Sequence, residues 1–299
     1  MKGKARMFYA VSLPNFAEHW HPLTLARLAH EAEEAGWDGF FIWDHILFNP
    51  YAGIAISDPW VALAAIALHT KRIRIGTMVT PLPRRRPWKL AREVVSIDHL
   101  SQGRLILGVG LGAPVHEEFE FLGEESDNMA RATRLDEGLD VLAGLLSGQK
   151  FAYQGSYYKV EETVFLPKPL QAPRIPIWVA ATWPHKRPLR RAARWDGIFP
   201  IEDGANFTPA MLRETVAYIR QYRQDTTPFD VVACGGTPGD DPARAGEILA
   251  GYRDAGATWW IEDVSMWRFR EWKSWTEPYV WPTEEIEERI RQGPPRIPA

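Results

Sequence analysis

The chain has 299 residues, 45% hydrophobic and 24% charged, which suits either two ordinary domains or one large α/β barrel. Its formal net charge of −3 argues against a nucleic-acid partner that depends on broad positive potential. A single cysteine excludes internal disulfides, and no apolar run reaches the ~18 residues that span a bilayer, so we expect a cytoplasmic protein with no membrane partner.

Short continuous apolar runs alternate along the chain with segments of helical period, a pattern typical of alternating strands and helices. In chain order, strands are predicted at residues 7–13, 39–43, 73–79, 104–109, 175–180, 197–200, 229–234 and 257–261. Helices are predicted between them at residues 21–35, 59–68, 88–100, 128–146, 188–195, 209–224 and 242–255. Asp58 is the expected cap of the second helix, with Pro59 at its first position.

Eight strands alternating with helices predict a single (β/α)8 TIM barrel over residues 1–299. Residues 148–172 break the rhythm with a hairpin pattern and scattered prolines, which indicates an insertion between the fourth and fifth β/α units. Residues 293–299 are expected to form a flexible tail. The alternative, a doubly wound open sheet, usually has a glycine turn after its first strand, and residues 12–15 contain no glycine.

Active-site residues of such barrels come from the carboxyl ends of the strands and the loops that follow. This rule selects Ser12, Asn15 and residues 43–45, 77–80, 110–112, 180–183, 201–203 and 262–263. Asp44 and His45 carry the most chemistry, because a carboxylate and an imidazole can orient a ring or move protons near neutral pH. The alternative is that Asp44 caps a loop and His45 packs structurally.

Small residues follow the fourth and fifth predicted strands. Glycines at 108, 110 and 112, and the pair Ala180–Ala181, would let a flat ligand approach the backbone closely. The backbone amides after the fifth strand could hold a phosphate with the help of the nearby cations Lys186, Arg187 and Arg190. These cations fit a solvated helix face equally well.

A metal site would draw on His19, His21, Asp44 and His45. No helical His-x-x-x-His or similar ligand spacing supports one, so we predict none.

Several motifs together resemble those of luciferase-like monooxygenases and their deazaflavin-dependent relatives. They lie at residues 33–45, 75–81, 101–110, 134–139, 176–181 and 192–197. The resemblance implies an oxidoreductase that binds reduced FMN or coenzyme F420 at the mouth of the barrel. It also implies a small organic substrate of unknown identity, a homodimer, and a separate flavin or F420 reductase as partner.

The resemblance also assigns roles to individual residues. A non-prolyl cis peptide at Thr77–Met78 would press against the ring, with Leu111–Gly112 flanking the ring or its ribityl chain. Asp44 would contact the polar edge of the ring and His45 would lie at its reactive face as the catalytic group. The amides of Ala180, Ala181, Thr182 and Trp183 would hold the phosphate.

Two positions depart from the family pattern. Relatives often have two glycines where this chain has Thr182–Trp183, which puts the approach of the phosphate in doubt. Deazaflavin-dependent sugar-phosphate dehydrogenases have a glutamate where this chain has Ala113, so a sugar phosphate is not expected as substrate. Glu117 or Glu118 could replace that glutamate, or lie on a solvated helix face.

Two other functions stay open: a non-catalytic flavin-binding barrel, and a metal-dependent barrel hydrolase. The chain also has 14 tryptophans. Some of them could line a substrate cavity or pack a dimer interface, namely Trp20, Trp183, Trp267, Trp272, Trp275 and Trp281.

Overall fold

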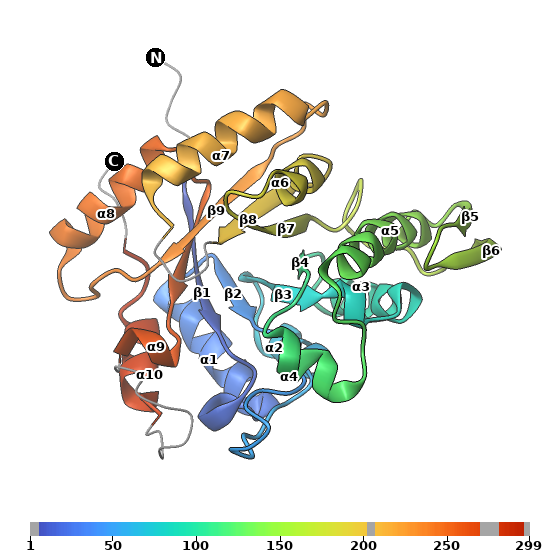
Figure 1. Ribbon diagram of the computed structural model, residues 1–299. Coiled ribbons are helices and arrows are strands. Elements are labelled where there is room, and N and C mark those ends of the chain that lie inside the picture. Colours follow the sequence, from blue (N-terminus) through green and yellow to red (C-terminus); the bar gives the residue numbers. More distant parts are fainter. Residues whose placement is uncertain (1–5, 202–206, 270–280, 296–299) are drawn as a thin grey trace.

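Eight parallel strands close into a barrel in the computed structural model, which describes residues 6–201, 207–269 and 281–295. The hydrogen-bonded order around the barrel is β1-β10-β9-β8-β7-β4-β3-β2 (Figure 1). The strands are β1 (Phe8–Leu13), β2 (Gly39–Ile42), β3 (Arg74–Pro81), β4 (Leu105–Gly110), β7 (Ile177–Thr182), β8 (Gly197–Ile201), β9 (Asp230–Gly235) and β10 (Trp259–Asp263). The predicted (β/α)8 barrel is therefore confirmed.

Helices surround this barrel: in the described residues, seven of them match the predicted ranges, and three, at residues 115–118, 266–269 and 283–291, were not predicted. The helices are α1 (Pro22–Ala35), α2 (Pro59–His69), α3 (Pro87–Leu100), α4 (Val115–Glu118), α5 (Asn128–Leu146), α6 (Lys186–Ala192), α7 (Pro209–Tyr222), α8 (Pro242–Asp254), α9 (Met266–Phe269) and α10 (Thr283–Arg291), with 3-10 turns η1 (Ala17–His19), η2 (Leu82–Arg84) and η3 (Glu120–Leu122). Asp58 caps α2 as expected, since its carboxylate accepts the amides of Trp60 and Val61. No helix in the described ranges combines the length and apolar character needed to cross a membrane.

The lower part of the barrel interior is filled by side chains. We call the buried inward-facing residues there the plug: Ala10, Phe41, Met78, Ile106, Trp178, Val232, Trp259 and Ile261. Strands must approach closely around this plug: a Cβ added at Gly76 would lie 1.9 Å from the backbone oxygen of Ile106. The plug separates the two ends of the barrel, and active sites of barrels of this kind lie above it, at the carboxyl ends of the strands.

The insertion expected at residues 148–172 is a two-stranded antiparallel sheet between α5 and β7. Its strands are β5 (Lys150–Gln154) and β6 (Lys159–Val164). The Glu137 carboxylate on α5 accepts the amides of Ser156, Tyr157 and Tyr158, which fixes the turn of this hairpin against the barrel.

The carboxyl-terminal region contains a helix that the apolar pattern did not predict. In α10, the buried residues Ile286 and Ile290 face the protein, and Trp37 donates its indole N–H to the backbone oxygen of Ile290. The first residue of the expected tail, Gly293, is buried, and its oxygen accepts from Arg289. Residues 296–299 of that tail lie outside the described residues.

His19 is fully buried beside this region, and we expect it to make stability depend on pH. Its Nδ1 lies 3.3 Å from the indole nitrogen of Trp281, its Nε2 has no partner among the described residues, and burial lowers its pKa to about 4. Between that value and the unfolded pKa near 6.5, the unfolded state binds more protons, so acidification through this window favours unfolding. Urea denaturation at pH 7 and pH 5 should show wild type losing about 2 kcal/mol more than His19→Gln. Equal losses would show that His19 titrates normally.

Candidate active site

Above the plug, the next inward-facing residues form the floor of the barrel mouth. Strand side chains alternate, and Val79, Phe199 and Cys234 pack on top of the plug. On one side lie Val79 (β3), Gly110 (β4), Ala180 (β7) and Phe199 (β8), which we call the apolar arc. On the other side lie Trp43, Ser12 (β1), Asp263 (β10) and Cys234 (β9), which we call the polar arc.

The apolar arc has little bulk at its centre. A Cβ added at Gly110 would lie 2.9 Å from Val79 Cγ2 and 3.2 Å from Ala180 Cβ, so these three residues meet as one smooth surface. Such a surface fits the face of a flat ring. The opposite arc presents hydrogen-bonding groups, with the indole N–H of Trp43 donating to Ser12 Oγ over 3.0 Å.

The non-prolyl cis peptide lies one bond later than the sequence predicted, at Met78–Val79 instead of Thr77–Met78. Thr77 keeps its place in the β3–β4 ladder opposite Leu107, and its hydroxyl donates to the oxygen of Gly108. The register shifts only between Thr77 and Thr80. Met78 therefore fills the plug, and the bulge brings Val79 to the mouth.

His45 is held on three sides at the end of β2. The Asn15 side chain brackets its backbone, accepting from the His45 amide and donating to the His45 oxygen. The rings of Phe16 and Phe48 pack edge-on against the imidazole. Its Nδ1 lies 2.9 Å from Glu118 Oε1, and no described residue pairs with its Nε2. With the Nδ1 proton shared with a carboxylate, Nε2 is left to exchange a proton with a ligand.

Glu118 is the residue that fixes this geometry. Its side chain is 1% exposed, it accepts the amides of Ile46 and Leu47, and it pairs with Arg84 over 3.0 Å. Sequence alone left Glu117 and Glu118 as equal replacements for the glutamate missing at Ala113. The structure selects Glu118 as the partner of His45, but its contacts make it a positioning residue that does not face the mouth.

Replacing Glu118 by glutamine should cost both stability and turnover. The change leaves Arg84, which is 6% exposed, with a weakened partner, and loss of one member of such a buried pair costs about 3 kcal/mol. It also allows the imidazole to adopt the other tautomer, so the pH profile of turnover should change. Glu117→Gln, one residue earlier on α4, makes none of these contacts and serves as control. If Glu118→Gln and Glu117→Gln gave the same urea curves and the same pH profiles of turnover, Glu118 would not be the residue that positions His45.

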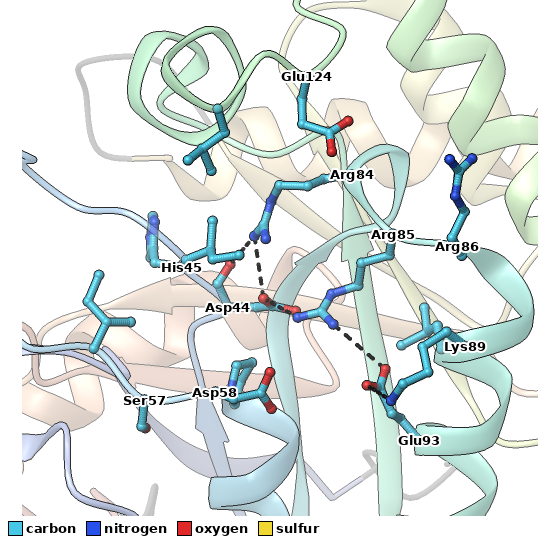
Figure 2. A pocket seen from close by; sticks show the side chains of 15 residues that line it. Asp44, His45, Ser57, Asp58, Arg84, Arg85, Arg86, Lys89, Glu93 and Glu124 are labelled. Carbon is cyan, nitrogen blue, oxygen red and sulfur yellow. Dashed lines mark hydrogen bonds and ion pairs between the residues drawn. The ribbon is translucent and has the colours of Figure 1, made fainter.

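Asp44 faces away from the mouth, toward two arginines that follow β3 (Figure 2). Its Oδ1 lies 2.7 Å from Arg85 and 3.5 Å from Arg84, while its buried Oδ2 has no partner among the described residues. Figure 2 shows these side chains around a pocket of about 400 Å³, which Arg86 and Lys89 also line. The sequence placed Asp44 at the ring edge; the observed contacts make it an anchor for the loop that carries His45.

The expected phosphate-binding segment is only partly available. The amide of Trp183 donates to the oxygen of Ile201, and Ala181 is buried on the outer side of β7. Thr182 is half-buried, and its oxygen accepts from the amide of His185. Lys186 has no ion pair within the described ranges, and its Nζ lies 5.3 Å from the centre of the Trp183 ring. A phosphate here would therefore depend on Lys186 more than on the Trp183 amide.

The loop after β4 is fixed by an arginine. Gly112 has a φ of +88°, which favours glycine, and an added Cβ would lie 2.6 Å from Pro81 Cβ. Arg131 donates to the backbone oxygens of Leu111 and Gly112 and stacks over Phe119. Leu111 is half-buried and directly follows Gly110 of the apolar arc.

The structure does not bring the histidines of the metal-hydrolase alternative together. In the described part of the chain, one group of possible ligands lies close enough for a metal: His30, Glu33 and Glu34. The Glu33 carboxylate is already used by the amides of residues 71–73. Glu202, Asp203, Trp272 and Trp275, which the sequence also singled out, lie outside the described residues, and the side chain of Trp267 is not described.

Comparison with known proteins gives matches over most of the chain. The family model of luciferase-like monooxygenases matches residues 15–278. An F420-dependent glucose-6-phosphate dehydrogenase of Nakamurella multipartita is 33% identical over 171 residues, 56% of this chain and 49% of that protein. The chain thus spans about half the length of this relative. The uncharacterised protein Rv0940c of Mycobacterium tuberculosis is 31% identical over 245 residues, 76% of this chain and 79% of its own length.

A solved structure shows the same fold. The monooxygenase RslO1 of Streptomyces bottropensis superposes with a TM-score of 0.75 at 21% identity, covering 96% of this chain and 97% of that one.

Proposed function

The chain belongs to the luciferase-like monooxygenase family, and from this premise we propose that it is an oxidoreductase whose flavin-type cofactor is coenzyme F420. The observation that carries the proposal is the apolar arc. A flat ring would lie on Val79, Gly110 and Ala180, within the reach of His45. When bound, the ring supplies two-electron redox chemistry at its face.

Different residues around the mouth would bind the cofactor and transfer protons. Leu111 and Gly112 would flank the ring, Thr77 and Met78 would support the bulge beneath it, and Lys186 would face the phosphate. His45 would hold or release a proton at Nε2, with Glu118 fixing its tautomer. The half-buried apolar groups of the floor, Val79 and Phe199, would exclude water from the reacting face.

F420 is favoured over FMN because the relative at 33% identity is F420-dependent. The pair Asp44–His45 also resembles the deazaflavin branch more than the luciferase branch. Glucose 6-phosphate is not the proposed substrate, since Ala113 is exposed and has no carboxylate.

A monooxygenase that uses reduced FMN is the second candidate. Its support is the similarity to RslO1 over nearly the whole length of both chains. In either case we propose a cytoplasmic protein that receives its reduced cofactor from a separate reductase.

A homodimer is part of the same proposal. Helix α2 is apolar on both faces, and Val61 and Leu68 are 59% and 69% exposed on its outer face. Light scattering of the purified chain would measure its mass directly.

Titration with F420 and, separately, with FMN tests the proposed cofactor. We expect the visible spectrum of F420 to shift saturably on addition of the protein, and that of FMN to remain unchanged. Saturable binding of FMN alone would assign the chain to the monooxygenase branch. Binding of neither would overturn the proposed function, and binding of F420 without turnover of any substrate would support a non-catalytic barrel.

A further inference from the structure

Two adjacent carboxylates end β10, and they face opposite sides of the barrel wall. Glu262 is fully buried on the outer side, where it accepts from Thr237, from the indole of Trp260 and from Arg268 and Arg289. These donors satisfy a structural carboxylate completely. Asp263, one residue later, alternates to the inner side.

The inward direction of Asp263 follows from its neighbours. Trp259 and Ile261, four and two residues earlier, belong to the plug, whereas Trp260 packs in the outer core. Asp263 lies in register with Ser12 on β1, and on the other side lies Cys234 of β9, whose pKa is raised first by burial and then by the nearby Asp263 and Glu262 carboxyls. Asp263 thus lies in the polar arc, opposite the apolar arc.

Asp263 has few partners compared with Glu262. Its Oδ1 accepts the amide of Ser265 over 2.8 Å. Burial raises the pKa of this carboxyl; the Ser265 amide and Arg268 oppose that effect, and Glu262 adds to it. The surroundings therefore favour the neutral acid more than is usual for aspartate.

We propose that Asp263 is a second proton-transferring residue of the active site, and that its substrate is a small uncharged carbonyl compound or the corresponding alcohol. This inference rests on the proposed function. With the ring on the apolar arc, a substrate above the ring meets Asp263 from the other side. A carboxyl that lies between Ser12 and Cys234, two uncharged groups, suits an uncharged oxygen as its partner.

The reaction balances with the reduced deazaflavin as hydride donor. With the cofactor bound, the carbonyl carbon would accept the hydride, the π electron pair of the C=O bond would move to oxygen, and Asp263 would donate its proton to that oxygen. The substrate would be reduced to the alcohol and the cofactor oxidised. Asp263, left as a carboxylate, regains a proton from solvent; alcohol oxidation runs through the same steps in reverse.

Infrared spectroscopy of the full chain tests the protonation directly, without cofactor. In a pH series, wild type should show a carboxylic-acid C=O band that shifts in D2O, persists to higher pH than the acid band of an exposed aspartate, and is absent from Asp263→Asn. Asp240→Asn, an exposed position, is the control and should keep the band. Asparagine retains the oxygen that accepts the Ser265 amide, so the variant should fold, which circular dichroism checks.

The second measurement is the rate at which the protein loaded with reduced F420 reduces acetone or cyclohexanone. Asp263→Asn should bind F420 as wild type does but turn over about 10²–10⁴-fold more slowly, and Asp263→Glu should recover part of the rate. Three results would overturn this inference alone, provided that wild type binds F420. They are an unchanged rate in Asp263→Asn, no carboxylic-acid band in wild type, and no reduction of either ketone by wild type. Failure of wild type to bind F420 would instead overturn the proposed function.

Discussion

Replacing His45 by alanine is expected to reduce turnover by about 10²–10⁴-fold while F420 still binds. The reason is that the His45 ring lies beside Trp43 of the polar arc, with Nδ1 held by Glu118 and Nε2 without a partner among the described residues. The ring would rest on the apolar arc, which this substitution does not touch. Stopped-flow measurement of cofactor oxidation, beside an equilibrium titration, separates the two effects.

A second histidine provides a matched control. His116 also lies 2.9 Å from a glutamate oxygen, that of Glu120, but this pair is on the surface. His116→Ala should therefore behave like wild type in both measurements. If His45→Ala also keeps wild-type turnover, His45 has no part in the chemistry.

Enlarging Ala180 to leucine is expected to weaken F420 binding by about 100-fold or more. Ala180 touches the space above Gly110, so a branched side chain there would occupy the floor on which the ring is proposed to lie. Overpacking of this kind typically costs 1–3 kcal/mol, and about 2.8 kcal/mol corresponds to 100-fold in affinity.

Ala243→Leu is the matched control, because Ala243 is exposed on α8, outside the barrel. Both variants should unfold at the urea concentration of wild type within a small margin, since neither side chain enters the plug. An Ala180→Leu protein with unaltered F420 affinity would place the ring elsewhere.

Most of the barrel was predictable because each strand is a short apolar run between turn residues. The range 128–146 agrees with α5 at both ends, since Asp127 caps it and accepts the amide of Ala130. Helix α10 was missed because Thr283–Arg291 is mostly charged, and only two isoleucines and Arg289 are buried. Its stability comes from packing on α1, which its own sequence does not reveal.

The site was predictable as a set of strand ends but not as a set of contacts. His45 and Glu118 are 73 residues apart, and no spacing distinguishes Glu118 from Glu117. The family resemblance placed both Asp44 and His45 at the ring, yet successive residues at a strand end face opposite ways. The same alternation places Glu262 and Asp263 on opposite sides of the barrel wall. The three residues before them are all apolar, so the sequence does not show which of the two faces inward.

A crystal structure of the protein with F420 bound tests the central claim most directly. The account predicts the deazaflavin ring on Val79, Gly110 and Ala180, beside Leu111 and with His45 at its edge. A ring bound in the pocket lined by Arg84, or in the pocket of about 610 Å³ around Trp37 and Trp259 at the opposite end of the barrel, would contradict it.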